Sequence, residues 1–177
     1  MIEQFKIWME EVKDKAIADK HEKAKVKGDE TKWKKEIWKS PKKNTAIKNR
    51  FRDEGANLGY KSRPSYVTNA GEWLYDFVWR QFNDDGHLIN VVLTMEIEVS
   101  EMHEKGIQYD FDKLLQADSM YKILVFQLKT EGEVNQALLN FKLATESYNS
   151  KSDSEYLLCG WCTSKNEFIY SDFKIKV

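Results

Sequence analysis

The chain has 177 residues, of which 41% are hydrophobic and 13% aromatic, so it can bury a core and is not expected to be disordered. This length fits one ordinary domain with a short helical appendage. No apolar run approaches 18 residues, and the first 15 residues contain acids and no cleavage site, so we expect neither a membrane span nor a secretory signal. Two cysteines provide no disulfide framework, and we expect a cytoplasmic location.

The net charge of −1 conceals a strong asymmetry. Residues 1–63 contain 18 basic and 11 acidic residues, a net charge of +7, whereas residues 64–177 contain 10 and 18, a net charge of −8. Residues 31–50 hold eight of the basic residues and one glutamate. Such a segment is typical either of a solvated helix face or of a surface that binds a polyanion.

The first third of the sequence predicts helices. An apolar stripe at a spacing of three to four residues predicts a first helix that ends near Gly28. The stripe consists of Ile2, Phe5, Met9, Val12 and Ala16. We expect a second helix from about Asp29 that stops at Ser40-Pro41, and a third over roughly residues 44–57. The amphipathic first helix could form a homodimer interface or pack on its own domain, and the sequence leaves both open.

After residue 61 the hydrophobic period changes from 3.6 to 2. We expect strands over residues 61–66, 72–80 and 88–100, with a hairpin turn at residues 83–86. The pattern then predicts further elements, in the order of a short helix capped by Asp110, a central strand over 121–128, an amphipathic helix over about 134–144, and strands near 156–163 and 167–175. This order of elements predicts a mixed α/β (α+β) fold.

Three carboxylates are expected to lie near one another on the hairpin. Glu96 and Glu98 share one face of their strand because side chains two residues apart point the same way. Asp76 lies on the preceding strand, where the matching face would bring it close to both. Such a cluster needs compensation, and a hard cation such as Mg²⁺ is a suitable partner. Alternatively, the two glutamates only line the solvated face of an antiparallel strand.

Roughly residues 44–128 resemble the PD-(D/E)XK nuclease superfamily. The resemblance is carried by the order of elements, which is a helix, three strands, a second helix and an apolar strand, and by the Glu-Ile-Glu sequence at 96–98 on the third strand. The resemblance implies a restriction-endonuclease-like αβββαβ core around a central mixed sheet, followed by a C-terminal helix and β-hairpin. Residues 1–43 would be a basic helical extension, and residues 44–177 the nuclease-like α/β domain. The implied activity is metal-dependent hydrolysis of nucleic acid, with DNA as the family's usual substrate.

Carried over from the family motif, Asp76 and Glu96 would bind Mg²⁺ or Mn²⁺. Glu98 stands where the family usually has lysine, and as in Glu-X-Glu variants it would position the attacking water. A lysine can also migrate to the following helix, where Lys113 is the candidate, although its helical position lies roughly opposite the buried stripe. Glu54 is the nearest match to the acid that the family often carries on its first helix.

The basic segment supplies the candidate phosphate contacts. The residues expected to bind nucleic acid are Lys34, Lys35, Lys42, Lys43, Lys48 and Arg50. The missing motif lysine leaves a second interpretation open, in which the domain keeps the nuclease fold without catalysis and serves in nucleic-acid binding or assembly. A third is a pure interaction protein whose basic helices dock on an acidic partner.

Weaker signals have two interpretations each. Cys159 and Cys162 match a C-x-x-C pattern, but on a strand they are expected to be buried structural thiols. Arg80 could pair with Asp76 or hold a phosphate. Gln127 interrupts an apolar strand and needs a polar partner or a place at the edge of the site.

Overall fold

The computed structural model describes residues 1–28, 38–66, 71, 73–100 and 104–177, which form four helices and six strands. In chain order these elements are α1 (Ile2–Val26), α2 (Ser40–Asn57), β1 (Lys61–Arg63), β2 (Phe77–Phe82), β3 (Leu88–Glu98), α3 (Glu104–Gln116), β4 (Tyr121–Leu128), α4 (Glu131–Ser147), β5 (Ser154–Cys162) and β6 (Glu167–Ile175). The expected mixed α/β class is confirmed. The second expected helix falls on residues that lie outside the described ranges.

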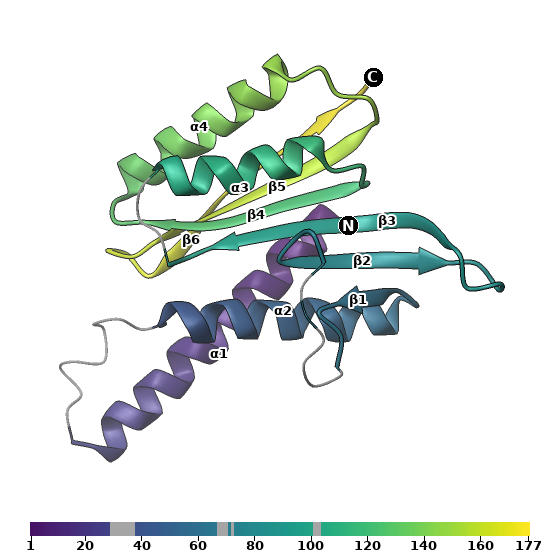
Figure 1. The fold of residues 1–177 in the computed structure, drawn as a ribbon. Coiled ribbons are helices and arrows are strands. Elements are labelled where there is room, and N and C mark those ends of the chain that lie inside the picture. Colours follow the sequence, from purple (N-terminus) through teal and green to yellow (C-terminus); the bar gives the residue numbers. More distant parts are fainter. Residues whose placement is uncertain (29–37, 67–70, 72, 101–103) are drawn as a thin grey trace.

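The six strands form one mixed sheet in the order β1-β2-β3-β4-β5-β6. The pairs β1/β2, β2/β3 and β5/β6 are antiparallel, whereas β3/β4 and β4/β5 are parallel. Helices α3 and α4 provide the two crossovers that parallel neighbours require. The β2–β3 hairpin extends beyond the rest of the sheet (Figure 1).

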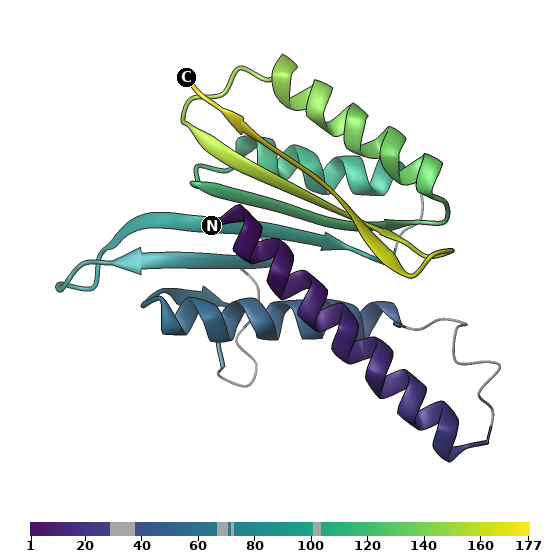
Figure 2. The same ribbon diagram turned by 180° about the vertical axis from the view of Figure 1, so that it is seen from behind.

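Helices cover both faces of the sheet. Helices α3 and α4 lie on one face, and α1 and α2 on the other, with α1 crossing α2 obliquely (Figures 1 and 2). Two hydrophobic clusters correspond to these layers. One joins α1 and α2 to the inner residues of the sheet, and the other joins α3 and α4 to β4 and β5. Of the candidate carboxylates, Asp76 immediately precedes β2, and Glu96 and Glu98 lie at the end of β3, which contacts α3.

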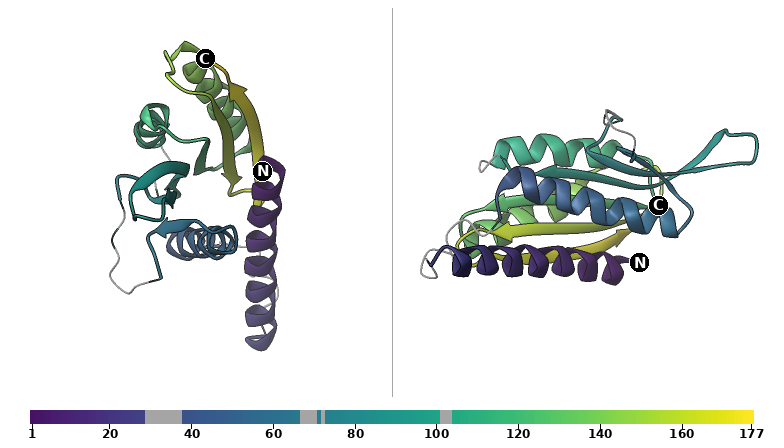
Figure 3. Two further views of the ribbon diagram at one scale, coloured as in Figure 1. Left: turned by 90° about the vertical axis from the view of Figure 1, so that its right-hand side faces the viewer. Right: turned by 90° about the horizontal axis from the view of Figure 1, so that it is seen from below.

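The apolar stripe of α1 packs on the chain's own sheet. Phe5 and Met9 are fully buried, and the ring of Phe5 contacts Phe51 of α2, Trp79 of β2 and Tyr121 of β4. Figure 3 shows α1 running along the face formed by the sheet and α2. Residues 1–28 therefore share a core with the rest of the fold, and the expected domain boundary at 43/44 falls inside α2.

Helix α2 begins at Ser40, where the sequence was expected to stop a helix. Pro41 occupies the first turn of α2. A helix tolerates proline there because the first amide groups have no intrahelical acceptor. The same Ser-Pro pair can therefore end one helix or begin the next, and the prediction of the start near Asn44 was late by one turn.

Three other predicted boundaries were wrong. Strand β2 begins at Phe77 rather than at residue 72, and Leu74 before it has a positive φ of 61°. Strand β1 is shorter than predicted and ends at Arg63. Helix α3 begins at Glu104, so Asp110 lies in its middle and does not cap it. The predicted strand over 121–128 is confirmed as β4.

Candidate functional site

Asp76 immediately precedes β2 and is held at the end of the β2/β3 ladder. Its Oδ2 accepts a hydrogen bond from the backbone N–H of Ile97 at 2.7 Å. The register pairs Phe77 with Met95, which places Asp76 beside Glu96 on the neighbouring strand. The Asp76 side chain is 21% exposed, so solvent reaches it. The hairpin thus brings two of the predicted carboxylates together.

Glu96 is the buried member of this pair, with a side chain only 1% exposed. Burial raises the pKa of Glu96 to about 8, and the Asp76 carboxylate adds to this effect, whereas Lys113 opposes it. Its Oε1 has no hydrogen-bond partner among the described residues, although the Lys113 ammonium lies within ion-pair distance. Burial therefore favours the neutral form of this carboxyl group at neutral pH, and a nearby cation favours the ionised form.

Lys113 of α3 reaches the carboxylates. Its Nζ lies 2.7 Å from Oε1 of Glu96 and 3.3 Å from Oδ1 of Asp110. The helical position of Lys113 is about 130° from the centre of the buried stripe, as the sequence indicated. Its four-carbon side chain is nevertheless long enough to reach Glu96 of β3. The angle around the helix axis alone does not take this length into account.

The Glu98 carboxylate is held by Ser100. Its Oε1 accepts hydrogen bonds from the backbone N–H and the hydroxyl of Ser100, at 2.9 and 2.8 Å. These contacts orient the carboxylate toward the end of the strand. Glu98 is still close enough to Asp110 for the two carboxylates to repel each other. Glu98 therefore belongs to the outer rim of the cluster.

The structure adds two residues that the sequence analysis did not place at the site. Asp110 of α3 has a raised pKa because of burial, with Asp76 and Glu98 contributing repulsion. Burial also raises the pKa of Tyr75, and the Glu96 carboxylate contributes. Asp110 could have been found from the sequence, because it lies three residues before Lys113 on one helix and such residues are neighbours on the helix surface. Tyr75 had no signal beyond its place next to Asp76.

A second lysine compensates the cluster from the other side of the sheet. Lys48 of α2 lies with its Nζ 3.4 Å from Oδ1 of Asp76. The described cluster thus combines the carboxyl groups of Asp76, Glu96 and Asp110 with two ammonium groups. Charges of opposite sign at this range lower the cost of gathering the carboxylates.

Glu54 does not join this cluster. It forms an ion pair with Arg50, which also binds Glu11 of α1 at 2.6 Å. The positions of Lys48 and Glu54 are about 120° apart around α2, so only Lys48 faces Asp76. The family's first-helix acid consequently has no counterpart among the described neighbours of Asp76.

The predicted nucleic-acid contacts are distributed over several places. Lys42 is exposed on α2, whereas Lys43 is 1% exposed and donates a hydrogen bond to Oε1 of Gln127 at 2.7 Å. Gln127 thus has the polar partner that its position required. Lys43 faces the core, away from any phosphate at the surface, and Lys34 and Lys35 lie outside the described residues.

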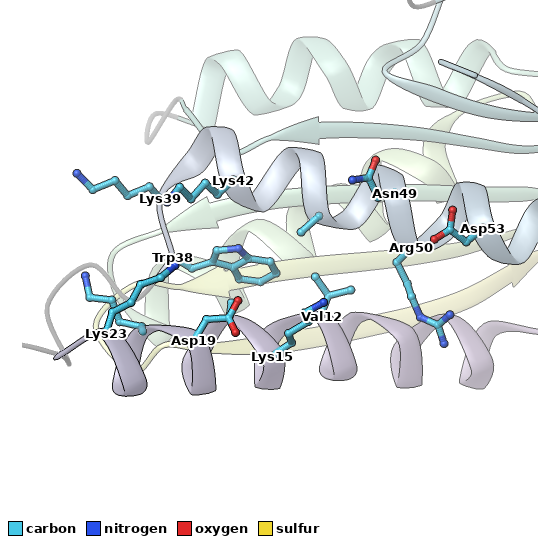
Figure 4. Close-up of a pocket in the computed structure, with 13 residues that line it drawn as sticks. Val12, Lys15, Asp19, Lys23, Trp38, Lys39, Lys42, Asn49, Arg50 and Asp53 are labelled. Atoms are coloured by element: carbon cyan, nitrogen blue, oxygen red, sulfur yellow. The ribbon is translucent and has the colours of Figure 1, made fainter. Parts of the chain in front are cut away.

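A groove of about 430 Å³ separates α1 from α2. The side chain of Trp38 lies in this groove between the two helices, with Lys39 and Lys42 at one end (Figure 4). Arg50 lies farther along α2 and is neutralised by Glu11 and Glu54. Aspartates also line the groove, so its charge is mixed.

The donor chemistry of Asp76 and Glu96 fits a magnesium ion. Carboxylate oxygens are preferred Mg²⁺ ligands, and such sites use one or two carboxylates together with water and substrate phosphate. The buried Oε1 of Glu96 is paired with the Lys113 ammonium at 2.7 Å, so a metal would have to share or displace this contact. Within the described ranges no group of three or more His, Cys, Asp or Glu side chains is arranged to hold a metal ion. A metal would therefore depend on water and substrate for its remaining ligands.

The prediction of buried cysteines is confirmed, since Cys159 and Cys162 are free thiols enclosed on β5. Across the part of the chain that the structure describes, no helix combines the length and apolarity needed to cross a bilayer. Comparison of the sequence with protein-family models found no match. Comparisons with curated proteins and with solved structures found no significant similarity.

Proposed function

We propose that this chain is a metal-dependent phosphodiester hydrolase of the PD-(D/E)XK type that acts on nucleic acid, with DNA as the first substrate to test. The observation that carries this proposal is the juxtaposition of Asp76, Glu96 and Lys113, with Lys113 Nζ 2.7 Å from the Glu96 carboxylate. Two acids from adjacent strands and one lysine are the residue types of the family motif.

The order of elements supports the same proposal. Helix α2, strands β1 to β3, helix α3 and strand β4 follow one another as the αβββαβ core of the family does. The antiparallel β2/β3 pair and the parallel β3/β4 pair bring the end of β3 close to α3. An acid on β3 and a lysine on α3 can therefore meet.

Each residue of the cluster has a distinct role in this proposal. Asp76 and Glu96 would hold Mg²⁺ or Mn²⁺, which when bound supplies Lewis acidity and lowers the pKa of a coordinated water. Lys113 would take the place of the motif lysine and orient the attacking water or stabilise negative charge on the phosphate. Glu98, held by Ser100, would assist from the rim.

The contacts of the cluster also favour a second function, a nuclease-like domain that binds nucleic acid without cutting it. Lys48 and Lys113 already compensate Asp76 and Glu96. A cluster neutralised by the chain's own lysines can persist as a structural element. This alternative predicts nucleic-acid binding that does not depend on divalent metal.

Cleavage assays on purified protein test the proposal. Supercoiled plasmid, single-stranded DNA and RNA would be incubated with Mg²⁺ or Mn²⁺ and the variants Asp76→Asn, Glu96→Gln and Lys113→Met. We expect each variant to lose about 100-fold or more of the wild-type rate. Asp112→Asn is the matched control, because Asp112 is an exposed neighbour of Lys113 on α3 and should retain full activity.

Calorimetry with Mg²⁺ on the same samples separates the two functions. Metal binding and cleavage that disappear together in Asp76→Asn and Glu96→Gln support the hydrolase. Nucleic-acid binding without cleavage, and without a metal requirement, would favour the inactive domain. Absence of metal binding by the wild type, even with oligonucleotide present, would overturn the metal site.

A further inference from the structure

The chain's arginines are concentrated at the edge of the sheet beside β1. The sequence contains four arginines among 28 basic residues, and three of them line a single cavity of about 310 Å³. These three are Arg52 of α2, Arg63 of β1 and Arg80 of β2. They come from three different elements, and Lys61 adds a fourth cation. Because lysine dominates elsewhere in the chain, this convergence indicates a need for the guanidinium group itself.

The cations of this cavity rest on aromatic rings. The guanidinium of Arg52 lies 4.3 Å from the ring centroid of Tyr66. Arg80 lies 5.3 Å and Lys61 5.0 Å from the ring centroid of Phe82. These rings support the charged groups from one side and limit their orientations. The cavity is therefore built from positioned cations.

Hydrogen-bond donors remain available in the cavity. The Nε atoms of Arg52 and Arg80 are buried and have no hydrogen-bond partner within the described residues. The other nitrogens of Arg52 contact Asn49 and the carbonyl oxygen of Ser65. Buried donors without acceptors are costly. An oxyanion that draws the guanidinium groups toward the cavity would provide acceptors for them.

The described residues that line the cavity carry a net positive charge. Among the described residues that line it, four are basic and none is acidic. Asp53 of α2 accepts a hydrogen bond from the hydroxyl of Tyr66, which lines the cavity. Burial lowers the pKa of Arg80, and repulsion from Arg63 contributes. The sequence left two uses open for Arg80, an ion pair with Asp76 or a contact to phosphate, and in the structure Asp76 forms an ion pair with Lys48.

We propose that the cavity formed by Arg52, Lys61, Arg63 and Arg80 binds a phosphate group. Arginine provides paired donors that match the geometry of phosphate oxygens. The site is separate from the carboxylate cluster and requires no hydrolysis. Lys48, which forms an ion pair with Asp76, and Arg52, which lines the cavity, are one helical turn apart on α2. The phosphate can come from a free nucleotide or from a nucleic-acid backbone.

Binding measured in the presence of a chelator tests this proposal independently of catalysis. Inorganic phosphate, thymidine monophosphate and a short oligothymidylate would each be titrated into the full chain by calorimetry at low salt. The variants are Arg80→Lys and Arg63→Gln, with Lys142→Gln as the control on the exposed surface of α4. Circular dichroism spectra verify that each variant is folded.

We expect Arg63→Gln and Arg80→Lys to weaken phosphate binding about tenfold each, and Lys142→Gln to leave it unchanged. Because the chelator removes divalent metal, phosphate binding in this assay does not depend on the proposed hydrolytic site. If the two arginine variants lose affinity for the oligonucleotide alone, the ligand is a backbone phosphate. If they lose affinity for the monophosphate as well, the ligand is a free nucleotide. The proposal is overturned if the wild type binds none of the three ligands or if both folded variants bind all of them as the wild type does.

Discussion

The indole of Trp79 occupies the space that a side chain at Gly55 would need. Trp79 is fully buried on β2, and its Nε1 donates a hydrogen bond to the carbonyl oxygen of Phe51 at 2.9 Å. A Cβ at Gly55 would lie 2.8 Å from Cδ1 of Trp79. Helix α2 can approach the sheet this closely only because residue 55 has no side chain. A glycine inside a helix is otherwise unfavourable.

Gly55→Ala should therefore destabilise the protein, even though alanine is the better helix former. We expect a loss of about 2 kcal/mol in the free energy of unfolding, because the indole has to shift within a packed core. Gly132→Ala in α4 is the control, since a Cβ there meets no atom within 4 Å. Urea denaturation of both variants measures the effect. A gain in stability at residue 55 would show that α2 does not pack this closely on β2.

The buried pair of Lys43 and Gln127 should lower stability at neutral pH. Burial lowers the pKa of Lys43 to about 7, from 10.5. Between these values the unfolded chain binds a proton that the folded chain does not, so this residue makes the protein less stable as the pH falls from 10.5 toward 7. Below that range both states carry the proton and the cost is constant.

Replacing Lys43 by Met and Gln127 by Leu together should remove this cost. We expect a gain of about 2 kcal/mol at about pH 6 and little gain at about pH 10.5. Lys42→Met, the exposed neighbour, controls for loss of charge and should change stability little at either pH. Thermal unfolding as a function of pH provides the measurement. An equal gain at both pH values would exclude a titrating Lys43 as the cause.

The start of α4 depends on a capping box formed by Thr130 and Glu133. The Thr130 hydroxyl accepts a hydrogen bond from the Glu133 backbone N–H, and the Glu133 carboxylate accepts one from the Thr130 backbone N–H. Thr130→Ala should cost about 1 kcal/mol of stability. Thr45→Ala on the exposed side of α2 is the comparison and should cost less. Chemical denaturation of both variants measures the loss of stability. Equal losses in Thr130→Ala and Thr45→Ala would contradict the capping role.

The role of α1 in the shared core can be tested at Phe5. This side chain is fully buried among rings from α1, α2, β2 and β4. Phe5→Ala should destabilise the protein by about 4 kcal/mol. Ile7→Ala, at a position 49% exposed on the same helix, should have a small effect. Retention of wild-type stability by Phe5→Ala would indicate that residues 1–43 form a dispensable extension.

Hydrophobic periodicity was sufficient to predict the helices and strands whose apolar pattern is unambiguous. The apolar run of residues 121–128 is buried on both faces as β4, and the alternation after residue 88 predicted most of β3. It failed where local chemistry allows two outcomes, as at Ser40-Pro41. Pairing of Asp76 with Glu96 followed from the hairpin, because antiparallel neighbours bring their side chains to one face.

The remaining site features depend on tertiary contacts that a linear pattern does not contain. Lys113 reaches Glu96 through the length of its side chain, which a helical projection omits. Lys43 belongs to a basic run, yet Gln127 and two tryptophan rings hold it inside the fold. Arg52, Arg63 and Arg80 are far apart in sequence and meet only because β1 lies between α2 and β2.

The contact between α1 and β6 links the earliest and latest parts of the chain. Lys6 forms an ion pair with Asp172, and Tyr170 donates a hydrogen bond to Glu10. On the ribosome, α1 is made long before β6 leaves the exit tunnel, so its apolar stripe must wait for part of its final binding surface. Premature termination before residue 170 would remove these two contacts and leave the side of α1 that faces β6 without its partner.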